Sequence, residues 1–134
     1  MTLILCADDR GGLLFHNRRL SRDSRLCIQI LKYCNGKQLW MNGYSVSIFP
    51  QNTPNIRLSE KFLDEAGEGE FCFVENVDVS TILSKVKRIV IYRWNRCYPS
   101  DVKLPEALLF GRKLVSTFDF EGNSHPTITQ EVYE

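Results

Sequence analysis

Residues 16–25 read His-Asn-Arg-Arg-Leu-Ser-Arg-Asp-Ser-Arg and place four arginines within eight positions. Guanidinium groups bind carboxylates and phosphates through paired, charge-assisted hydrogen bonds. The segment also precedes a predicted helix, whose N-terminus disfavours nearby cations. Two interpretations follow: a solvated loop, or a site at which Arg18, Arg19 and Arg22 bind a small anionic molecule or an acidic protein partner.

Further polar side chains follow predicted strands. Asn42 comes after residues 38–41, Glu75 and Asn76 come after residues 71–74, and Trp94 and Arg96 follow the strand around Ile89. In open α/β sheets, ligands bind at the carboxyl ends of the strands. These residues are therefore further candidates for a binding site. The alternative for Trp94 is an aromatic side chain that only fills space.

Other chemistry has little support in the sequence. The two histidines, His16 and His125, lie far apart, so no clustered zinc signature is present and no metal is predicted. There is no Cys-x-x-Cys pair and no glycine-rich phosphate loop. His125, within Gly-Asn-Ser-His-Pro, is most simply interpreted as part of a hairpin loop.

Length and composition indicate a soluble globular protein. The 134 residues are 43% hydrophobic and 25% charged, which predicts one domain over residues 1–134. A net charge of +1 argues against nucleic acid as a partner, and no apolar run is long enough to span a membrane. The acidic N-terminus is unlike a signal peptide, and the odd number of cysteines, five, fits free thiols. We therefore expect a cytoplasmic protein.

Predicted strands and helices alternate along most of the chain. The strands are predicted at residues 3–7, 38–41, 56–58, 71–74 and around 89–91. Helices are predicted from Leu26 to Cys34, around Phe62, and through residues 79–86. The first of them is capped by Ser21, Asp23 or Ser24. Two antiparallel strands, near 114–115 and 128–132, close the chain. This order predicts a three-layer α/β domain.

The end of the chain carries a resemblance. A β-branched run from Ile89 to Ile91 is followed by a turn cluster, by Asp101 and by Pro105 four residues later, and the last residues alternate as in a strand. This order resembles the C-terminal third of dihydrofolate reductase. The resemblance implies a mainly parallel central sheet with an antiparallel C-terminal hairpin.

The residues that act in that family are not matched. An ungapped alignment from the first strand to the second places Leu26 where the family has the acid that holds the pterin. On the late strand, Tyr92 corresponds to the threonine that supports that acid. Glu75 and Asn76 stand where a Gly-Gly pair lets the dinucleotide approach the sheet. The comparison implies a degenerate active site without a cofactor. A slip of three residues would put Asp23 in the place of the acid, and the sequence does not decide between Asp23 and Leu26.

On that scaffold the candidate residues converge on one polar pocket, formed by Arg18, Arg19, Arg22, Asn42, Glu75, Asn76, Trp94 and Arg96. Alanine at Arg18 and Arg19 is then expected to abolish anion binding with little effect on stability. The alternative is an enzyme of changed specificity with Glu75, His16 or Asp23 as acid or base. RNA binding is a third and weaker interpretation. The sequence identifies neither ligand nor oligomeric state, and it leaves open whether the protein is an enzyme.

Overall fold

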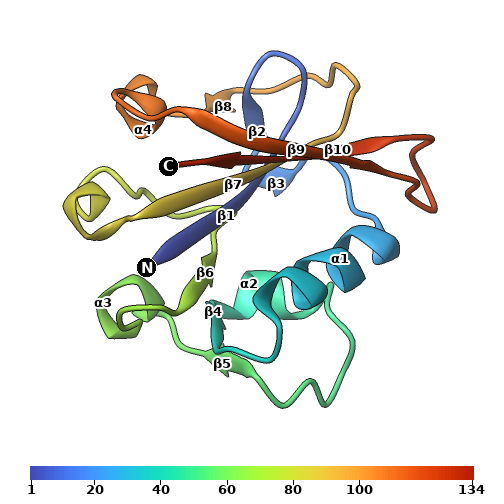
Figure 1. Ribbon diagram of the computed structural model, residues 1–134. Coiled ribbons are helices and arrows are strands. Elements are labelled where there is room, and N and C mark those ends of the chain that lie inside the picture. Colours follow the sequence, from blue (N-terminus) through green and yellow to red (C-terminus); the bar gives the residue numbers. More distant parts are fainter.

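A seven-stranded sheet forms the centre of the computed structural model, which describes residues 1–134 (Figure 1). Its strands, in spatial order, are β5 (Ile56–Leu58), β4 (Leu39–Met41), β6 (Phe71–Phe73), β1 (Thr2–Ala7), β7 (Arg88–Arg93), β10 (Ile128–Tyr133) and β9 (Leu114–Phe120). The pairs from β5 to β7 are parallel, whereas β10 runs antiparallel to both β7 and β9. The predicted fold class, a mainly parallel α/β sheet with an antiparallel C-terminal hairpin, is confirmed.

The arginine-rich segment belongs to a second, small sheet. Its strands lie in the order β3 (Arg18–Arg19), β2 (Gly12–Phe15) and β8 (Val102–Lys103). β2 and β3 pair antiparallel across His16 and Asn17, which have φ angles of 50° and 62°. Two consecutive positive φ angles are typical of the tight turns that join hairpin strands. The first arginines are therefore held on a hairpin and are not part of a free loop.

One long helix packs on the sheet. α1 spans Ser24–Cys34, and its N-cap is Asp23, whose carboxylate accepts hydrogen bonds from the N–H groups of Arg25 and Leu26. It ends at Asn35, whose φ of 50° is left-handed. The other helices are single turns: α2 (Gly43–Val46), α3 (Phe62–Glu65) and α4 (Glu106–Leu109). Of the three cap candidates, the chain uses Asp23.

The helix expected through residues 79–86 does not form. Only Leu83–Lys85 makes a short 3₁₀ turn, η1. The N–H groups of Ile82, Lys85 and Val86 each bond to the carbonyl three residues earlier, as in successive turns. Val79, Ile82 and Val86 are still buried, because turns linked in this way also bring every third or fourth side chain to one side. The apolar spacing therefore predicts correctly which side chains are buried, but the helix it predicts is wrong.

The sheet separates two hydrophobic clusters. Alternate residues of β1 divide between them: Ile4 packs with Leu26 and Ile30 of α1, and Leu3 and Leu5 pack on the opposite face. Such burial on both faces explains the continuous apolar runs of the parallel strands. Leu26, fully within the α1 cluster, is a core side chain.

Candidate functional site

Arg19, at the end of β3, forms a paired salt bridge with Glu75, which follows β6. Its Nε and Nη2 atoms donate to the two carboxylate oxygens at 2.9 and 3.0 Å. The Glu75 side chain is only 8% exposed, and the hydroxyl of Ser45 also donates to it, at 2.8 Å. The hydrogen bond to Glu75 raises the pKa of Arg19, although burial acts in the opposite direction. The charge of Arg19 is thus neutralised within the protein.

The same arginine is held by Tyr44 of α2. Its Nη2 donates to the Tyr44 carbonyl at 2.9 Å, and its guanidinium lies over the Tyr44 ring, 4.2 Å from the centroid. Beside this cluster, Asn42 caps α2 and donates to the side-chain oxygen of Asn76 at 2.9 Å. The two asparagines predicted to bind a ligand therefore bind each other.

A small cavity lies at the carboxyl ends of β1 and β6. Its lining is Cys6, Leu13, Arg19, Leu20, Ser21, Val74, Glu75 and Trp94, and its volume is about 10 Å³. That space holds about one water molecule. A much larger hollow, about 560 Å³, lies along residues 46–58 and has no charged side chain in its lining. The place where the fold would hold a ligand is therefore almost filled.

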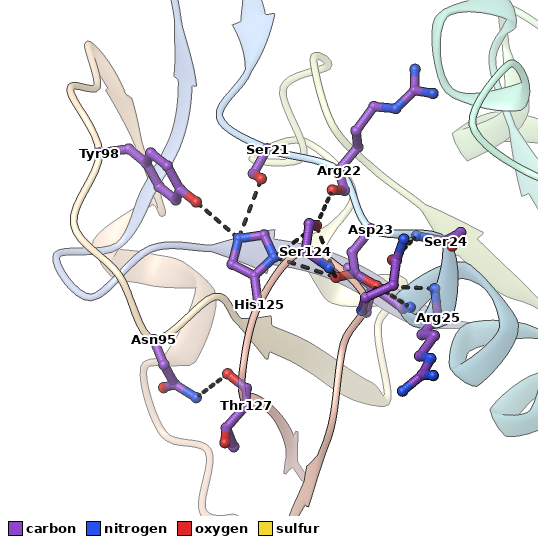
Figure 2. A network of polar contacts seen from close by, with 12 residues as sticks. Ser21, Arg22, Asp23, Ser24, Arg25, Asn95, Tyr98, Ser124, His125 and Thr127 are labelled. Atoms are coloured by element: carbon purple, nitrogen blue, oxygen red, sulfur yellow. Dashed lines mark hydrogen bonds and ion pairs between the residues drawn. The ribbon is translucent and has the colours of Figure 1, made fainter.

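The structure does not gather all the predicted site residues. Arg19, Glu75 and Trp94 line the cavity, but Arg18, Arg22 and Arg96 are exposed and form no ion pair. In Figure 2 the side chain of Arg22 extends away from the buried groups. His16 is exposed at the tip of the β2–β3 turn. The eight residues thus divide between an inner cluster and an outer surface.

Asp23 is the centre of a buried network that the sequence did not reveal (Figure 2). Besides capping α1, its carboxylate accepts from the N–H groups of Asn123 and Ser124 at 3.2 and 2.8 Å and from the Ser124 hydroxyl at 3.0 Å. Burial alone would raise the pKa of Asp23, but the hydrogen bonds from Ser124 and Asn123 outweigh it and hold the pKa well below its usual range. Asp23 is therefore an ionised carboxylate.

His125 completes this network. Its Nδ1 lies 3.4 Å from Asp23 Oδ2, and its Nε2 lies 2.8 Å from the Tyr98 hydroxyl and 3.3 Å from the Ser21 hydroxyl. The ring stacks on Trp94, with centroids 4.6 Å apart. The hairpin-loop interpretation is correct for the backbone, since residue 125 lies between β9 and β10, but the side chain is buried.

Gly122 is the residue that could have pointed to this site. A Cβ atom there would lie 2.5 Å from Asp23 Oδ2, so a larger residue would displace the carboxylate. A glycine beside Asn-Ser-His-Pro is a signal of close backbone approach as well as of a turn. Nothing in the spacing, however, indicates that the approaching group is Asp23.

Comparisons with known proteins bear on the fold. No protein-family model and no curated protein sequence matches the chain. Among solved structures, a dihydrofolate reductase from Enterococcus faecalis, complexed with NADP(H) and RAB-propyl, superposes with a TM-score of 0.68 at 10% identity. The match covers 99% of this chain and 94% of that one. On this match, the chain has the dihydrofolate reductase-like fold.

None of the helices is long and apolar enough to cross a membrane.

Proposed function

We propose that the protein has no NADPH-dependent reductase activity and binds a small anion or an acidic protein partner through exposed arginines. The carrying observation is the cavity of about 10 Å³ at the carboxyl ends of β1 and β6. Sites for small molecules and cofactors commonly enclose about 300–1,000 Å³. A pterin or nicotinamide ring does not fit unless Arg19, Glu75 and Leu20 move apart.

The residues around the sheet support the absence of reductase chemistry. Leu26 is a core side chain, and the Tyr92 hydroxyl donates to Gln130 at 2.8 Å within the core. In the ungapped alignment Leu26 stands at the position of the family's acid, and Tyr92 corresponds to its supporting threonine. The side chain of Glu75, held in place by Arg19 and Ser45, also stands where the resemblance requires a glycine that lets a dinucleotide approach the sheet. On this proposal, the active site is degenerate.

The outer arginines support binding of an anion. Arg18 lies on β3, whereas Arg22 and Arg96 follow β3 and β7 and are close in sequence to Ser21 and Trp94 of the cavity lining. None of the three arginines has an acidic partner within the protein. The Asp23 carboxylate at the start of α1 offsets the nearby cations, so these arginines disfavour the helix less than the sequence predicts. The positive charge of the exposed arginines, which no acidic side chain compensates, supports the binding of an anionic ligand. The binding surface is therefore proposed to lie outside the cavity.

The test is a titration of the protein with inorganic phosphate and with a polyglutamate peptide at low salt. Arg18→Ala and Arg22→Ala are each expected to weaken binding about tenfold or more, since charge-assisted hydrogen bonds contribute roughly 1.5–3 kcal/mol. Arg57→Ala, at an exposed arginine on β5, is the matched control and should bind as the native protein does. Stability should change by less than about 0.5 kcal/mol in all three variants. Equal affinity in every variant would refute the role of the arginines.

The alternative is an enzyme of changed specificity on the same scaffold. Of its three candidate acids or bases, Glu75 is locked to Arg19 and His16 is exposed on a turn. Only Asp23 contacts the side chain of a histidine, His125. Any acid–base chemistry is therefore best sought around this pair.

A further inference from the structure

We propose that Ser21 is a nucleophile that accepts small acyl groups from activated esters. In this proposal His125 acts as its base, and the Asp23 carboxylate orients His125. This inference does not depend on anion binding by the outer arginines. The three side chains come from two segments about 100 residues apart and meet in the order hydroxyl, imidazole and carboxylate (Figure 2). That order is the one by which a serine is activated for acyl transfer.

The hydrogen bonds assign the roles of the two ring nitrogens. Asp23 is ionised and can only accept, so the nitrogen that faces it, Nδ1, carries the proton. Nε2 then presents its lone pair to the hydroxyls of Ser21 and Tyr98. The Ser124 hydroxyl, 3.1 Å from Nδ1, and the stacked Trp94 hold the ring in this orientation. His125 is thus placed as a base toward Ser21.

Ser21 is the hydroxyl of the network that also lines the cavity, beside the stacked Trp94. A purely structural network would not need a hydroxyl at this wall, since His125 Nε2 already has Tyr98 at 2.8 Å. The separation of 3.3 Å between Ser21 and His125 is in the range in which such pairs lie before substrate binds. The exposed side of the serine is therefore where an ester carbonyl would approach.

Arg19 supplies a donor on the same cavity. Its Nε and Nη2 atoms are occupied by Glu75 and Tyr44, whereas Nη1 forms no hydrogen bond within the protein. A fixed N–H donor can stabilise the oxyanion that develops during acyl transfer. The cavity volume of about 10 Å³ restricts the substrate to the smallest acyl groups, seated at its mouth.

The reaction is balanced without a cofactor. Ser21 Oγ bonds to the acyl carbon while its proton passes to His125 Nε2. The bond to the leaving oxygen then breaks, and that oxygen takes the proton from Nε2. The products are acyl-Ser21 and the free alcohol, and water can later release the acid by the same route in reverse.

Tyr98 provides a distinguishing feature. Its hydroxyl, at 2.8 Å, competes with Ser21 for the single lone pair of Nε2. Removal of this hydroxyl in Tyr98→Phe should leave the lone pair to Ser21 and accelerate acylation severalfold. If His125 served only to hold the fold together, the same variant would lower stability without any gain in reactivity.

The experiment is incubation with p-nitrophenyl acetate, followed by intact-mass measurement and peptide mapping. We expect acetylation of Ser21 in the native protein and in Ser84→Ala, a change at an exposed serine distant from the network. We expect a loss of at least about 100-fold in Ser21→Ala. No acetyl-Ser21 in the native protein, or slower acetylation in Tyr98→Phe, would overturn the proposal.

A second measurement covers the case in which Ser21→Ala does not fold. In Ser21→Cys, the imidazole should favour the thiolate, so the introduced thiol should react with iodoacetamide near neutral pH faster than the exposed Cys97. Burial raises the pKa of Cys27, Cys34 and Cys72 to about 12, so these thiols react slowly. Alkylation of the introduced thiol no faster than that of Cys97 would contradict activation by His125.

Discussion

Replacement of Asp23 by alanine is expected to lower the free energy of unfolding by about 3–5 kcal/mol, the largest effect of any single polar substitution in this chain. The variant loses the cap of α1 and leaves the N–H groups of Asn123 and Ser124 and the ring of His125 without their acceptor. A cap alone contributes about 1 kcal/mol, and unsatisfied buried donors add to it. Urea unfolding followed by circular dichroism measures the difference. Asp64→Ala, on an exposed aspartate of α3, is the control.

The effect of Asp23 should depend on pH in a defined direction. The pKa of Asp23 is lower in the folded protein than the value of about 3.9 in an unfolded chain. The stabilisation is therefore fully present above about pH 5 and is lost as the pH falls through about 4 toward the folded pKa. The difference in stability between the native protein and Asp23→Ala should shrink over that interval. A constant difference from about pH 7 to about pH 3 would contradict an ionised, hydrogen-bonded Asp23.

Replacement of Arg19 by alanine is expected to cost about 2–3 kcal/mol of stability, because it leaves the Glu75 carboxylate nearly buried with Ser45 as its hydrogen-bond partner. Loss of one partner of a buried ion pair costs about 3–5 kcal/mol. The Arg19 side chain is 19% exposed, so the expected loss of stability is smaller. The measurement is again the free energy of unfolding. The sequence predicts that alanine at Arg18 and Arg19 leaves stability nearly unchanged; with the structure we expect this for Arg18 alone.

Two controls distinguish the effect of a buried unpaired charge on stability from the effect of losing a salt bridge. Arg88→Ala removes a salt bridge to Glu134 whose two side chains are each 43% exposed, and it should cost less than about 1 kcal/mol. The double variant Arg19→Met with Glu75→Leu removes both buried charges and should recover most of the stability lost in Arg19→Ala. Equal losses in Arg19→Ala and Arg88→Ala would show that the Arg19–Glu75 pair is solvated like a surface pair.

The fold was predictable because burial follows local patterns. Continuous apolar runs such as residues 3–7 identify strands covered on both faces, and the spacing of Leu26, Ile30 and Cys34 identifies one face of a helix. Residues 79–86 carry the apolar spacing of a helix without forming one, because linked 3₁₀ turns produce similar spacing. A pattern of burial therefore predicts which side chains enter the core better than it predicts the backbone around them.

The candidate site was only partly predictable because its contacts join distant segments. Glu75 and Trp94, singled out because they follow predicted strands, both line the cavity. Their partners come from other elements: Arg19 lies 56 residues from Glu75, and Asp23 lies 102 residues from His125. Sequence alone could not show that Arg19 is neutralised by Glu75, because this pairing depends on where the β2–β3 hairpin lies against β6. It also could not show that Arg18, Arg22 and Arg96 stay exposed.

The central claim, a dihydrofolate reductase-like fold whose cofactor cleft is closed, is tested most directly by calorimetric titration of the native protein with NADPH. The Enterococcus faecalis reductase provides the positive control, because its structure was solved as a complex with NADP(H). We predict no heat of binding up to concentrations that correspond to a Kd of about 1 mM, a standard binding free energy of about −4 kcal/mol. A saturable isotherm with a micromolar Kd would show that the Arg19–Glu75 cluster opens to admit the dinucleotide, and it would contradict the account.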